Sequence, residues 1–288
     1  MKILITIPHY YNADSASIHG SGKNDPQPRI HALSMCLSNL HTLLGNSQCM
    51  IDIRDKKAIS VNNNLTNEID IVICTANNKD LLEHLNVHKS FYKHHQTTLE
   101  NPKMLGFECH KILKENLGKY DYYCFMEDDL IINDSLFFEK IKWFNSKNEN
   151  INLLQPNRYE ASNGGRVLKS YVDGDINPRA TVNFQNINEF LSIDANFLGY
   201  KILFKRPLNP HSGCFFLTQA QMEYWANQPC FLDMDIGFIS PLESTASLGI
   251  MKTFRIYKPT PQNANFLEIQ HFGDAFLRLI GNQVALQS

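Results

Sequence analysis

Three consecutive acidic residues, Glu127, Asp128 and Asp129, directly follow the apolar run Tyr122–Met126. A short apolar run of this kind predicts a buried β-strand, so the three carboxylates would stand together where the strand ends. Carboxylates this close raise one another's pKa. A divalent cation with a phosphate-bearing ligand would neutralise them, because Mn²⁺ and Mg²⁺ take oxygen ligands and share their shell with phosphates. The acids therefore predict a metal–diphosphate site that holds Mn²⁺ or Mg²⁺.

An acidic residue after a strand can also be the N-cap of the next helix. Here Asn133, Asp134 and Ser135 stand directly before the helical pattern of residues 136–144 and are better placed to cap it. We therefore predict a functional role for the acids at 127–129.

The elements that would position these acids alternate between strand and helix in the first half of the chain. Strands are predicted over 2–7, 69–74 and 122–126, and helices over 29–44, 79–94 and 101–117. This alternation predicts an α/β fold with a mostly parallel sheet flanked by helices. Ligands of such sheets bind outside the carboxyl ends of the strands. Pro8, His9 and Tyr10 follow the first strand, so we expect them to line one crevice with the acids.

The second half of the chain is less regular. Residues 157–178 predict loops; 200–204, 213–218 and 252–257 predict strands; 218–227 and 240–249 predict helices. The clearest helical pattern covers 271–280, where apolar side chains recur at i, i+3, i+4 and i+7.

The bulk composition is that of an ordinary globular protein, with 288 residues, 43% hydrophobic and 19% charged. The net charge of −2 and the lack of a basic run argue against nucleic-acid binding. No run of about 18 apolar residues predicts a membrane span, although peripheral association with a membrane is compatible with the sequence. The seven cysteines form no CxxC pair and predict reduced thiols, so we expect a cytoplasmic protein.

Several blocks resemble GT-A glycosyltransferases. The segment Asp121–Leu130, followed by Phe137-Phe138-Glu139, resembles their metal-site segment, and its acidic triplet is most similar to that of N-acetylglucosaminyltransferase I. Residues Ile3–Asn12 are similar to the first nucleotide-binding strand of the large GT-A families. Gly213–Phe216 and Ser240–Glu243 resemble the acceptor-side strand and the helix that carries the catalytic acid. The blocks are spread across most of the chain, and the acidic block is the most specific.

The resemblance implies a single GT-A domain, with a nucleotide-binding half at 1–132 and an acceptor-binding half at 133–288. Its implied activity is sugar transfer from a nucleotide diphosphate sugar, with UDP expected, to a carbohydrate or glycoconjugate acceptor. By motif match Asp129 would bind the metal, and Glu127 and Asp128 would face the ribose and base. A late histidine often completes the metal shell or contacts the diphosphate in this family, which points to His271. The alternative for His271 is an ordinary capping or surface residue.

Glu243 is the first candidate for the catalytic base that takes the acceptor's proton, followed by Asp235 and then Asp233. If Glu243 is the base, the reaction is expected to invert the sugar's configuration. Ser240-Pro241-Leu242-Glu243 also matches a helix capping box, in which a glutamate bound to a backbone N–H is a poorer base.

Two other functions remain open at this level. A sugar nucleotidyltransferase also uses clustered acids and a metal, but the sequence has no glycine-rich basic loop after the first strand. A non-catalytic carbohydrate-binding protein could keep the fold without binding a metal-dependent donor.

Overall fold

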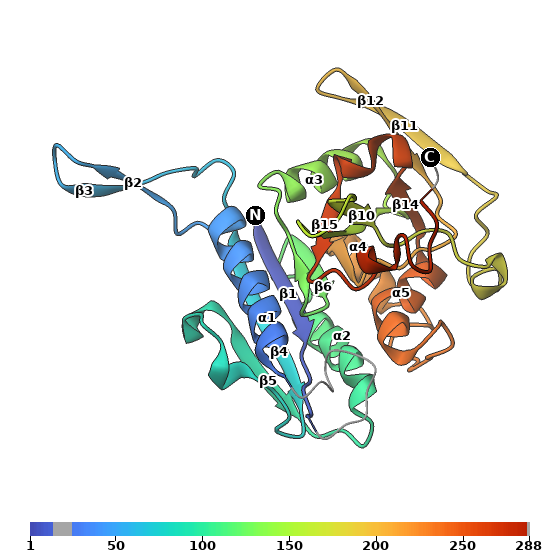
Figure 1. Ribbon diagram of the computed structural model, residues 1–288, viewed down its shortest axis with the longest axis horizontal. Coiled ribbons are helices and arrows are strands. Elements are labelled where there is room, and N and C mark those ends of the chain that lie inside the picture. The colour runs from blue at the N-terminus through green and yellow to red at the C-terminus, as the bar shows by residue number, and fades with distance from the viewer. Residues whose placement is uncertain (14–24, 287–288) are drawn as a thin grey trace. The chain divides into compact units, whose positions relative to one another are not determined.

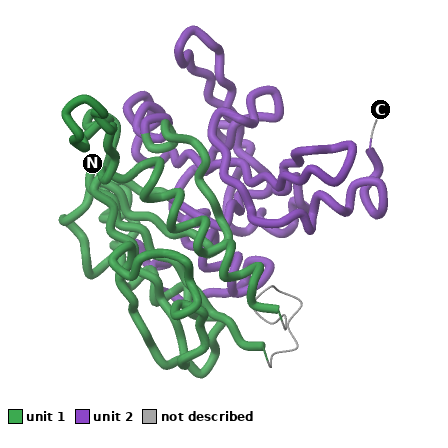
Figure 2. The backbone as a smooth tube through the Cα atoms, turned by 60° about the vertical axis from the view of Figure 1, so that its left-hand side comes forward, with its two compact units in different colours: residues 1–138, 216–227 green, residues 139–215, 228–288 purple. Residues whose placement is uncertain are grey.

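The structure, a computed structural model, describes residues 1–13 and 25–286. The chain divides into two compact units, one of residues 1–138 and 216–227 and the other of residues 139–215 and 228–288 (Figure 2). Two segments of chain thus build each unit. The expectation of one domain divided at residue 132 stays a prediction.

A mainly parallel sheet forms the centre of the first unit (Figure 1). Its strand order is β13-β6-β1-β4-β5, with β1 at Lys2–Pro8, β4 at Glu68–Ala76, β5 at Lys93–Thr97, β6 at Tyr122–Met126 and β13 at Cys214–Thr218. Strand β1 pairs in parallel with both β4 and β6, and β4 pairs in parallel with β5. Every residue of β6 is buried, as expected for a strand covered on both faces. The predicted α/β class, with its parallel sheet and flanking helices, is confirmed.

Helices α1 (Gln27–Asn39), α2 (Leu105–Glu115) and α4 (Gln219–Ala226) belong to the first unit. Helix α2 packs on β1, β4 and β6, and its His110 contacts the rings of Phe125 on β6 and Trp225 on α4. Helix α1 continues into a π-helical turn, Leu40–Leu44, which together cover the helix predicted at 29–44. Helix α4 starts with a capping box between Thr218 and Gln221.

The prediction of a helix over 79–94 is wrong. This segment holds two short 3₁₀ turns, Leu82–His84 and Lys89–Phe91, and then enters β5. Leu81 and Leu82 are buried, but none of residues 83–92 is, so no apolar stripe continues to support a helix. Elsewhere in this unit, β2 (Cys49–Asp52) and β3 (Lys57–Ser60) form an antiparallel hairpin, and β7 is a short strand at Leu130–Ile131.

The second unit contains short strands in two groups. Strands β11 (Ser192–Phe197), β12 (Tyr200–Lys205), β14 (Arg255–Pro259) and β8 (Asn152–Leu154) pair in that order. Strand β9 (Asn157–Ala161) pairs antiparallel with β10 (Lys169–Tyr171) and parallel with β15 (Glu268–His271). Residues 157–178 were predicted as loops, and the strands β9 and β10 correct this. Pairing with β15, more than a hundred residues away, creates β9, and the local sequence does not reveal it.

Helix α5 (Pro241–Thr253) lies in the second unit, and helix α3 (Phe137–Lys147) runs into it from the first. Asp134 Oδ1 accepts a hydrogen bond from the Leu136 amide, 2.8 Å away, so the predicted capping role of this region is confirmed. Within the second unit, Trp143 and Phe144 pack against an aromatic cluster made of Phe197, Phe204 and Phe266.

The helix predicted over 271–280 is also wrong. His271 ends strand β15, and a single 3₁₀ turn, Leu277–Leu279, follows. Gly273 between them has φ +104°, which a helix cannot contain. Of residues 271–280 only Leu277 is buried, so the regular apolar spacing does not correspond to a buried helical face.

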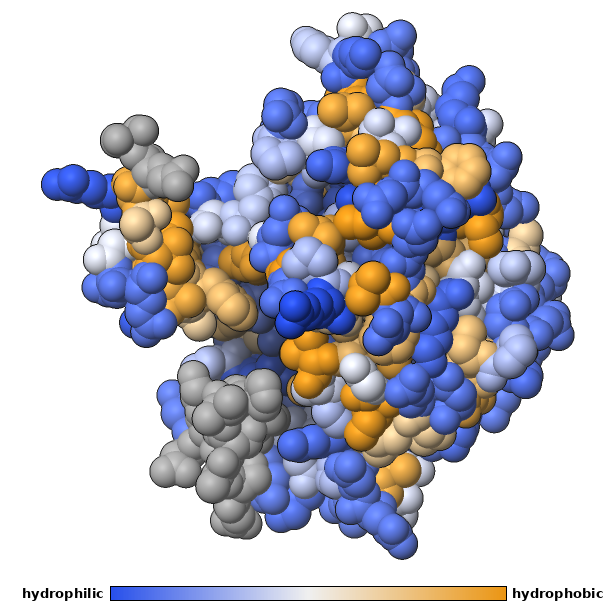
Figure 3. Space-filling model, turned by 90° about the vertical axis from the view of Figure 1, so that its right-hand side faces the viewer, coloured by the Kyte–Doolittle hydropathy of each residue, from blue (hydrophilic) through white to orange (hydrophobic). Residues whose placement is uncertain are grey.

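The surface carries scattered large apolar side chains, among them Ile53, Leu198 and Tyr200 at 84%, 79% and 74% exposure. On the face in Figure 3, apolar side chains form patches separated by hydrophilic ones. Scattered exposure of this kind is normal for a folded protein and does not identify a partner. Among the described helices, none is long and apolar enough to cross a membrane. All seven cysteines fall within the described residues, and all are free thiols.

Candidate functional site

The carboxyl ends of β1, β4 and β6 meet at one edge of the first unit's sheet, because these strands are parallel and adjacent. The residues that follow them include His9 after β1, Leu81 in the segment after β4, and the acids Glu127–Asp129 after β6. The predicted crevice-lining residues from two strands are therefore brought to the same edge.

His9 and Asp128 lie opposite each other and are hydrogen-bonded. The β1–β6 ladder pairs Ile3 with Tyr122 and Thr6 with Phe125. Continuing this register by three residues on each strand places His9 against Asp128, and their Nδ1 and Oδ2 atoms are 2.6 Å apart. Both side chains are buried, with His9 at 0% and Asp128 at 4% exposure.

The hydrogen bonds of His9 settle which ring nitrogen carries the proton. The amide N–H of Leu81 donates to Nε2 at 3.1 Å, so Nε2 is an acceptor. Nδ1 therefore holds the hydrogen and donates it to the Asp128 carboxylate. The backbone N–H of His9 donates to the Cys74 carbonyl at 2.8 Å, which fixes the residue to β4 as well.

Arg29, in the first turn of α1, joins Asp128 and Asp129. Its Nη2 donates to both carboxylate oxygens of Asp128, at 2.6 Å for Oδ2, and its Nη1 donates to Asp129 Oδ2 at 3.0 Å. The side chains of Arg29, Asp128 and Asp129 are 18%, 6% and 20% exposed. An internal cation thus already offsets part of the negative charge of the acidic triplet.

The ionisation of this cluster follows from burial and charge. Burial acts to raise the pKa of Asp128, but the charge of Arg29 and the hydrogen bond from His9 outweigh it and lower the pKa below its usual value. Burial also acts to lower the pKa of Arg29, and the charges of Asp128 and Asp129 outweigh that effect and raise it. Asp128 and Arg29 are therefore an ionised pair at neutral pH.

Arg29 was not among the residues predicted from sequence, although two local features point to it. Helix α1 is the first helix after β1, so its first turn is expected near the carboxyl edge of the sheet. A cation in the first turn opposes the helix dipole and is unfavourable unless acids neutralise it. The other predicted residues of this edge, Pro8, Tyr10 and Glu127, are half-buried beside the cluster.

The donor atoms at this edge fit a hard divalent cation that completes its shell with phosphate. Among residues 1–13 and 25–286, no group of three or more His, Cys, Asp or Glu side chains converges to hold a metal ion. Mg²⁺, however, is usually held by one or two carboxylates together with substrate phosphates and water. Asp129, more exposed than Asp128, is the carboxylate best suited to such a cation.

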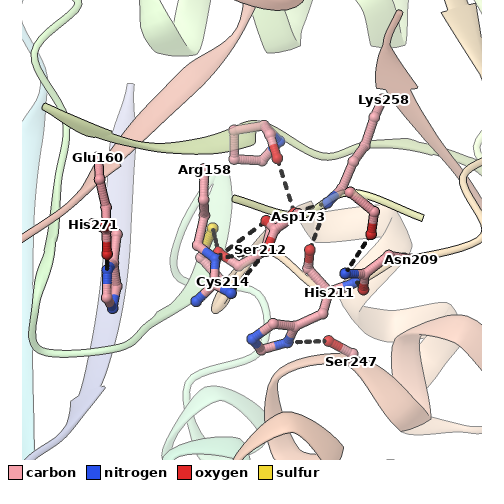
Figure 4. Close-up of polar contacts among 12 residues, drawn as sticks. Arg158, Glu160, Asp173, Asn209, His211, Ser212, Cys214, Ser247, Lys258 and His271 are labelled. Atoms are coloured by element: carbon pink, nitrogen blue, oxygen red, sulfur yellow. Dashed lines mark hydrogen bonds and ion pairs between the residues drawn. The ribbon is translucent and has the colours of Figure 1, made fainter. Parts of the chain in front are cut away.

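In the second unit, His271 is oriented by a buried carboxylate. Its Nδ1 lies 2.9 Å from Glu160 Oε1 (Figure 4). Glu160 Oε2 accepts from the Leu277 amide at 2.7 Å. Glu160 is fully buried, whereas the His271 side chain is 18% exposed. A carboxylate on one imidazole nitrogen is the partner that metal-bound histidines typically have. The geometry thus suits the predicted role of His271 as a ligand.

A second network of the second unit starts from the same strand, because Arg158 and Glu160 both belong to β9 (Figure 4). Arg158 donates to Asp173 from Nη2 at 2.7 Å, and Lys258 Nζ lies 3.4 Å from the same carboxylate. Lys258 also donates to the His211 carbonyl. Burial acts to raise the pKa of Asp173, but Lys258 and Arg158 hold it far below its usual value. Burial, with Arg158 adding to it, lowers the pKa of His211 well below normal, so His211 is neutral at pH 7.

The three candidates for the catalytic base differ in their surroundings. Asp235 accepts from Lys252 at 2.7 Å and from the Gly237 amide at 2.8 Å, and these hydrogen bonds lower its pKa. Asp233 shares Lys252 at 3.0 Å. Glu243, half-buried in the first turn of α5, accepts from the Ser240 hydroxyl, whose oxygen accepts from the Leu242 amide at 3.3 Å. The capping contact of Glu243 is thus with a hydroxyl group, whereas Lys252 and the Gly237 amide stabilise the charged form of Asp235.

No protein-family model matches the sequence, and no curated protein matches it. Among solved structures, the chain is similar to TarS from S. aureus, with a TM-score of 0.45 and 13% identity over 95% of this chain and 37% of that one. It is also similar to residues 1–349 of TarS in complex with UDP, with a TM-score of 0.45 and 11% identity over 89% of this chain and 57% of that one. The chain therefore spans well under two thirds of these proteins. Similarity of this degree does not assign a function to the chain.

Proposed function

We propose that the chain is a GT-A glycosyltransferase that moves a sugar from a nucleotide diphosphate sugar, with UDP as the expected nucleotide, to a hydroxyl of a carbohydrate or glycoconjugate acceptor. One observation carries the proposal. At the carboxyl edge of a parallel sheet, His9 is hydrogen-bonded to Asp128, and Arg29 forms ion pairs with Asp128 and Asp129. Charged groups at that edge are where ligands of α/β sheets bind.

On the donor side, Asp129 is proposed to hold Mn²⁺ or Mg²⁺, and Glu127 to face the ribose. The bound cation would act as a Lewis acid for the negative charge that the leaving diphosphate gains, which is worth several kcal/mol. His9 keeps Asp128 in place, because its Nδ1–H donates to that carboxylate while Leu81 holds its other nitrogen. His271, oriented by Glu160, is proposed to complete the metal shell or to contact the diphosphate.

On the acceptor side, Glu243 is proposed to take the proton of the attacking hydroxyl, with Asp235 second. A positioned base contributes roughly 10²–10⁴-fold to rate. Asp235 is ranked second because Lys252 and the Gly237 amide stabilise its charged form. Direct attack assisted by such a base inverts the configuration at the sugar.

The test is isothermal calorimetry of the full chain with UDP, in the presence and absence of Mn²⁺. The proposal predicts that UDP binds and that Mn²⁺ strengthens its binding by at least about tenfold, or 1.4 kcal/mol. Absence of UDP binding under both conditions would contradict it.

The same preparation separates the two rival functions. A nucleotidyltransferase would release pyrophosphate from UTP and a sugar 1-phosphate, whereas the proposed enzyme releases UDP from a UDP-sugar. A non-catalytic carbohydrate-binding protein would bind sugars without Mn²⁺-dependent binding of UDP.

A further inference from the structure

Arg29 contacts the two acids unequally. Its Nη2 donates to both oxygens of Asp128, whereas its contact with Asp129 runs from Nη1 to Oδ2 at the longer distance of 3.0 Å. Charge-assisted hydrogen bonds are stronger when they are shorter, and Asp128 accepts two short ones from Nη2 where Asp129 accepts one longer one from Nη1. The Arg29–Asp128 contact is therefore the firm one, and the Arg29–Asp129 contact is the one that is easier to exchange.

Asp128 is also enclosed from its other side. Its Oδ2 accepts from His9 as well as from Arg29, and its side chain is 6% exposed, compared with 20% for Asp129. To reach a ribose hydroxyl, Asp128 would have to give up charge-assisted hydrogen bonds in a buried place, which is costly. Asp128 is thus poorly suited to contact the donor directly.

We propose that Asp128 anchors Arg29, and that the Arg29 guanidinium contacts the diphosphate of the bound donor. The inference rests on the proposed function and assigns a binding residue to that same site. When Asp129 takes the divalent cation, Nη1 of Arg29 exchanges Asp129 for a phosphate oxygen, while Nη2 stays on Asp128. Among the described residues Nε of Arg29 is buried without a hydrogen-bond partner, so the guanidinium has further donor capacity.

The charges support this arrangement. The divalent cation and Asp129 together leave one positive charge against a diphosphate that carries at least two negative ones. Arg29 is a fixed cation beside these acids whose N–H groups can donate to the phosphate oxygens, and arginine's planar fork suits such oxygens. In the absence of donor, Asp128 pairs with the Arg29 guanidinium and keeps it in place. The positive charge of Arg29 is therefore not buried without a compensating negative charge.

A double-mutant cycle tests the anchoring. UDP binding with saturating Mn²⁺ is measured by calorimetry for wild type, Arg29→Gln, Asp128→Asn and the double variant. We expect each single variant to weaken UDP binding roughly 10- to 100-fold, since charged hydrogen bonds are lost. The double variant should be little worse than either single one, because both remove the same interaction. Losses that multiply in the double variant would overturn the proposal, since Asp128 would then act independently of Arg29.

A second measurement separates contact with phosphate from a merely structural role. Uridine has the base and ribose of UDP but no phosphate, so Arg29→Gln should change uridine binding less than about threefold while weakening UDP binding. An equal loss for both ligands would overturn the proposal. If Arg29→Gln does not fold, Arg29→Lys replaces it; this variant keeps the charge, loses the fork, and should still weaken UDP selectively.

The wild-type protein separates failure of this inference from failure of the proposed function. If wild type binds no UDP, the proposed function falls and this inference falls with it. If wild type binds UDP with Mn²⁺ and the Arg29 variants bind it equally well, only the role of Arg29 is overturned.

Discussion

The buried carboxylate of Glu160 and the imidazole of His271 pair across two parallel strands, with Oε1 and Nδ1 2.9 Å apart. The β9–β15 ladder pairs Asn157 with Glu268 and Tyr159 with Gln270, so one more step places Glu160 opposite His271. The same continuation of a parallel register creates the His9–Asp128 contact in the first unit. In both cases a histidine at the carboxyl end of one strand pairs with the carboxylate of the residue opposite it, which lies on the neighbouring strand or just after it.

We predict that Glu160→Gln destabilises the protein by about 1–3 kcal/mol. Glu160 accepts from both His271 and the Leu277 amide, and a glutamine would turn its NH₂ group toward one of these donors. Urea unfolding measures the free energy of unfolding of each variant. The control is Glu223→Gln, which replaces an exposed acid of α4 and should unfold within about 0.5 kcal/mol of wild type. Equal stability of the two variants would contradict the predicted contribution of the Glu160 hydrogen bonds.

The same Glu160→Gln protein should bind Mn²⁺ about 10- to 100-fold more weakly in the presence of UDP, because an outer carboxylate orients a metal-bound histidine. Calorimetry with wild type and His271→Ala measures this. If His271→Ala binds Mn²⁺ as wild type does, His271 is not a ligand.

Replacing Asp129 by Asn should remove Mn²⁺-dependent binding of UDP while leaving the fold intact. We expect a loss of about 100-fold or more, in line with several kcal/mol from the cation. Circular dichroism checks the fold, and Asp194→Asn, an exposed acid on β11 paired with Lys201, is the matched control. Retained Mn²⁺ dependence in Asp129→Asn would refute the assigned role.

Glu243→Gln should lower kcat for sugar transfer roughly 10²–10⁴-fold and leave UDP affinity unchanged, because a general base acts in the chemical step. Asp235→Asn should lower kcat much less, since its carboxylate is held by Lys252. The rate of UDP release from a UDP-sugar in the presence of an acceptor measures kcat for both variants. A larger loss for Asp235→Asn would reverse the order of the candidates.

Stability should fall as the pH drops below about 6.5, in part because of His211. Burial lowers the pKa of His211 in the folded protein, so the unfolded chain binds a proton that the folded chain does not, and stability rises with pH in this range. From pH 7.5 to 5.5 this group should cost about 1.4 kcal/mol. Its Nδ1 lies 2.9 Å from the Ser247 hydroxyl.

His211→Asn can keep the contact with Ser247 and cannot titrate. Urea unfolding gives the free energy of unfolding at pH 7.5 and at pH 5.5. The loss of this free energy between the two pH values should be about 1.4 kcal/mol smaller in the variant than in wild type. An unchanged pH effect would mean that His211 is protonated in the folded protein.

Local patterns sufficed to predict the strand that ends in the three acids and the cap of the helix that follows it. The run Tyr122–Met126 is a buried strand with the boundaries read from its apolar residues, and the capping residue Asp134 precedes helix α3 as expected. Such features depend on neighbours in the chain, which the sequence displays directly. Apolar spacing failed over 79–94 and 271–280, where few of the side chains are buried and Gly273 adopts a positive φ.

The sequence by itself determined that acids stand at the end of a buried strand in an α/β protein, because burial and periodicity are local properties. Only the tertiary structure decided what those acids contact. His9 and Arg29 lie 119 and 99 residues from Asp128 along the chain, and their contacts depend on the pairing register of β1 with β6 and on the placement of α1. Registers and helix placements arise from the packing of whole elements, so the contacts of Arg29 with both carboxylates could be identified only in the folded chain.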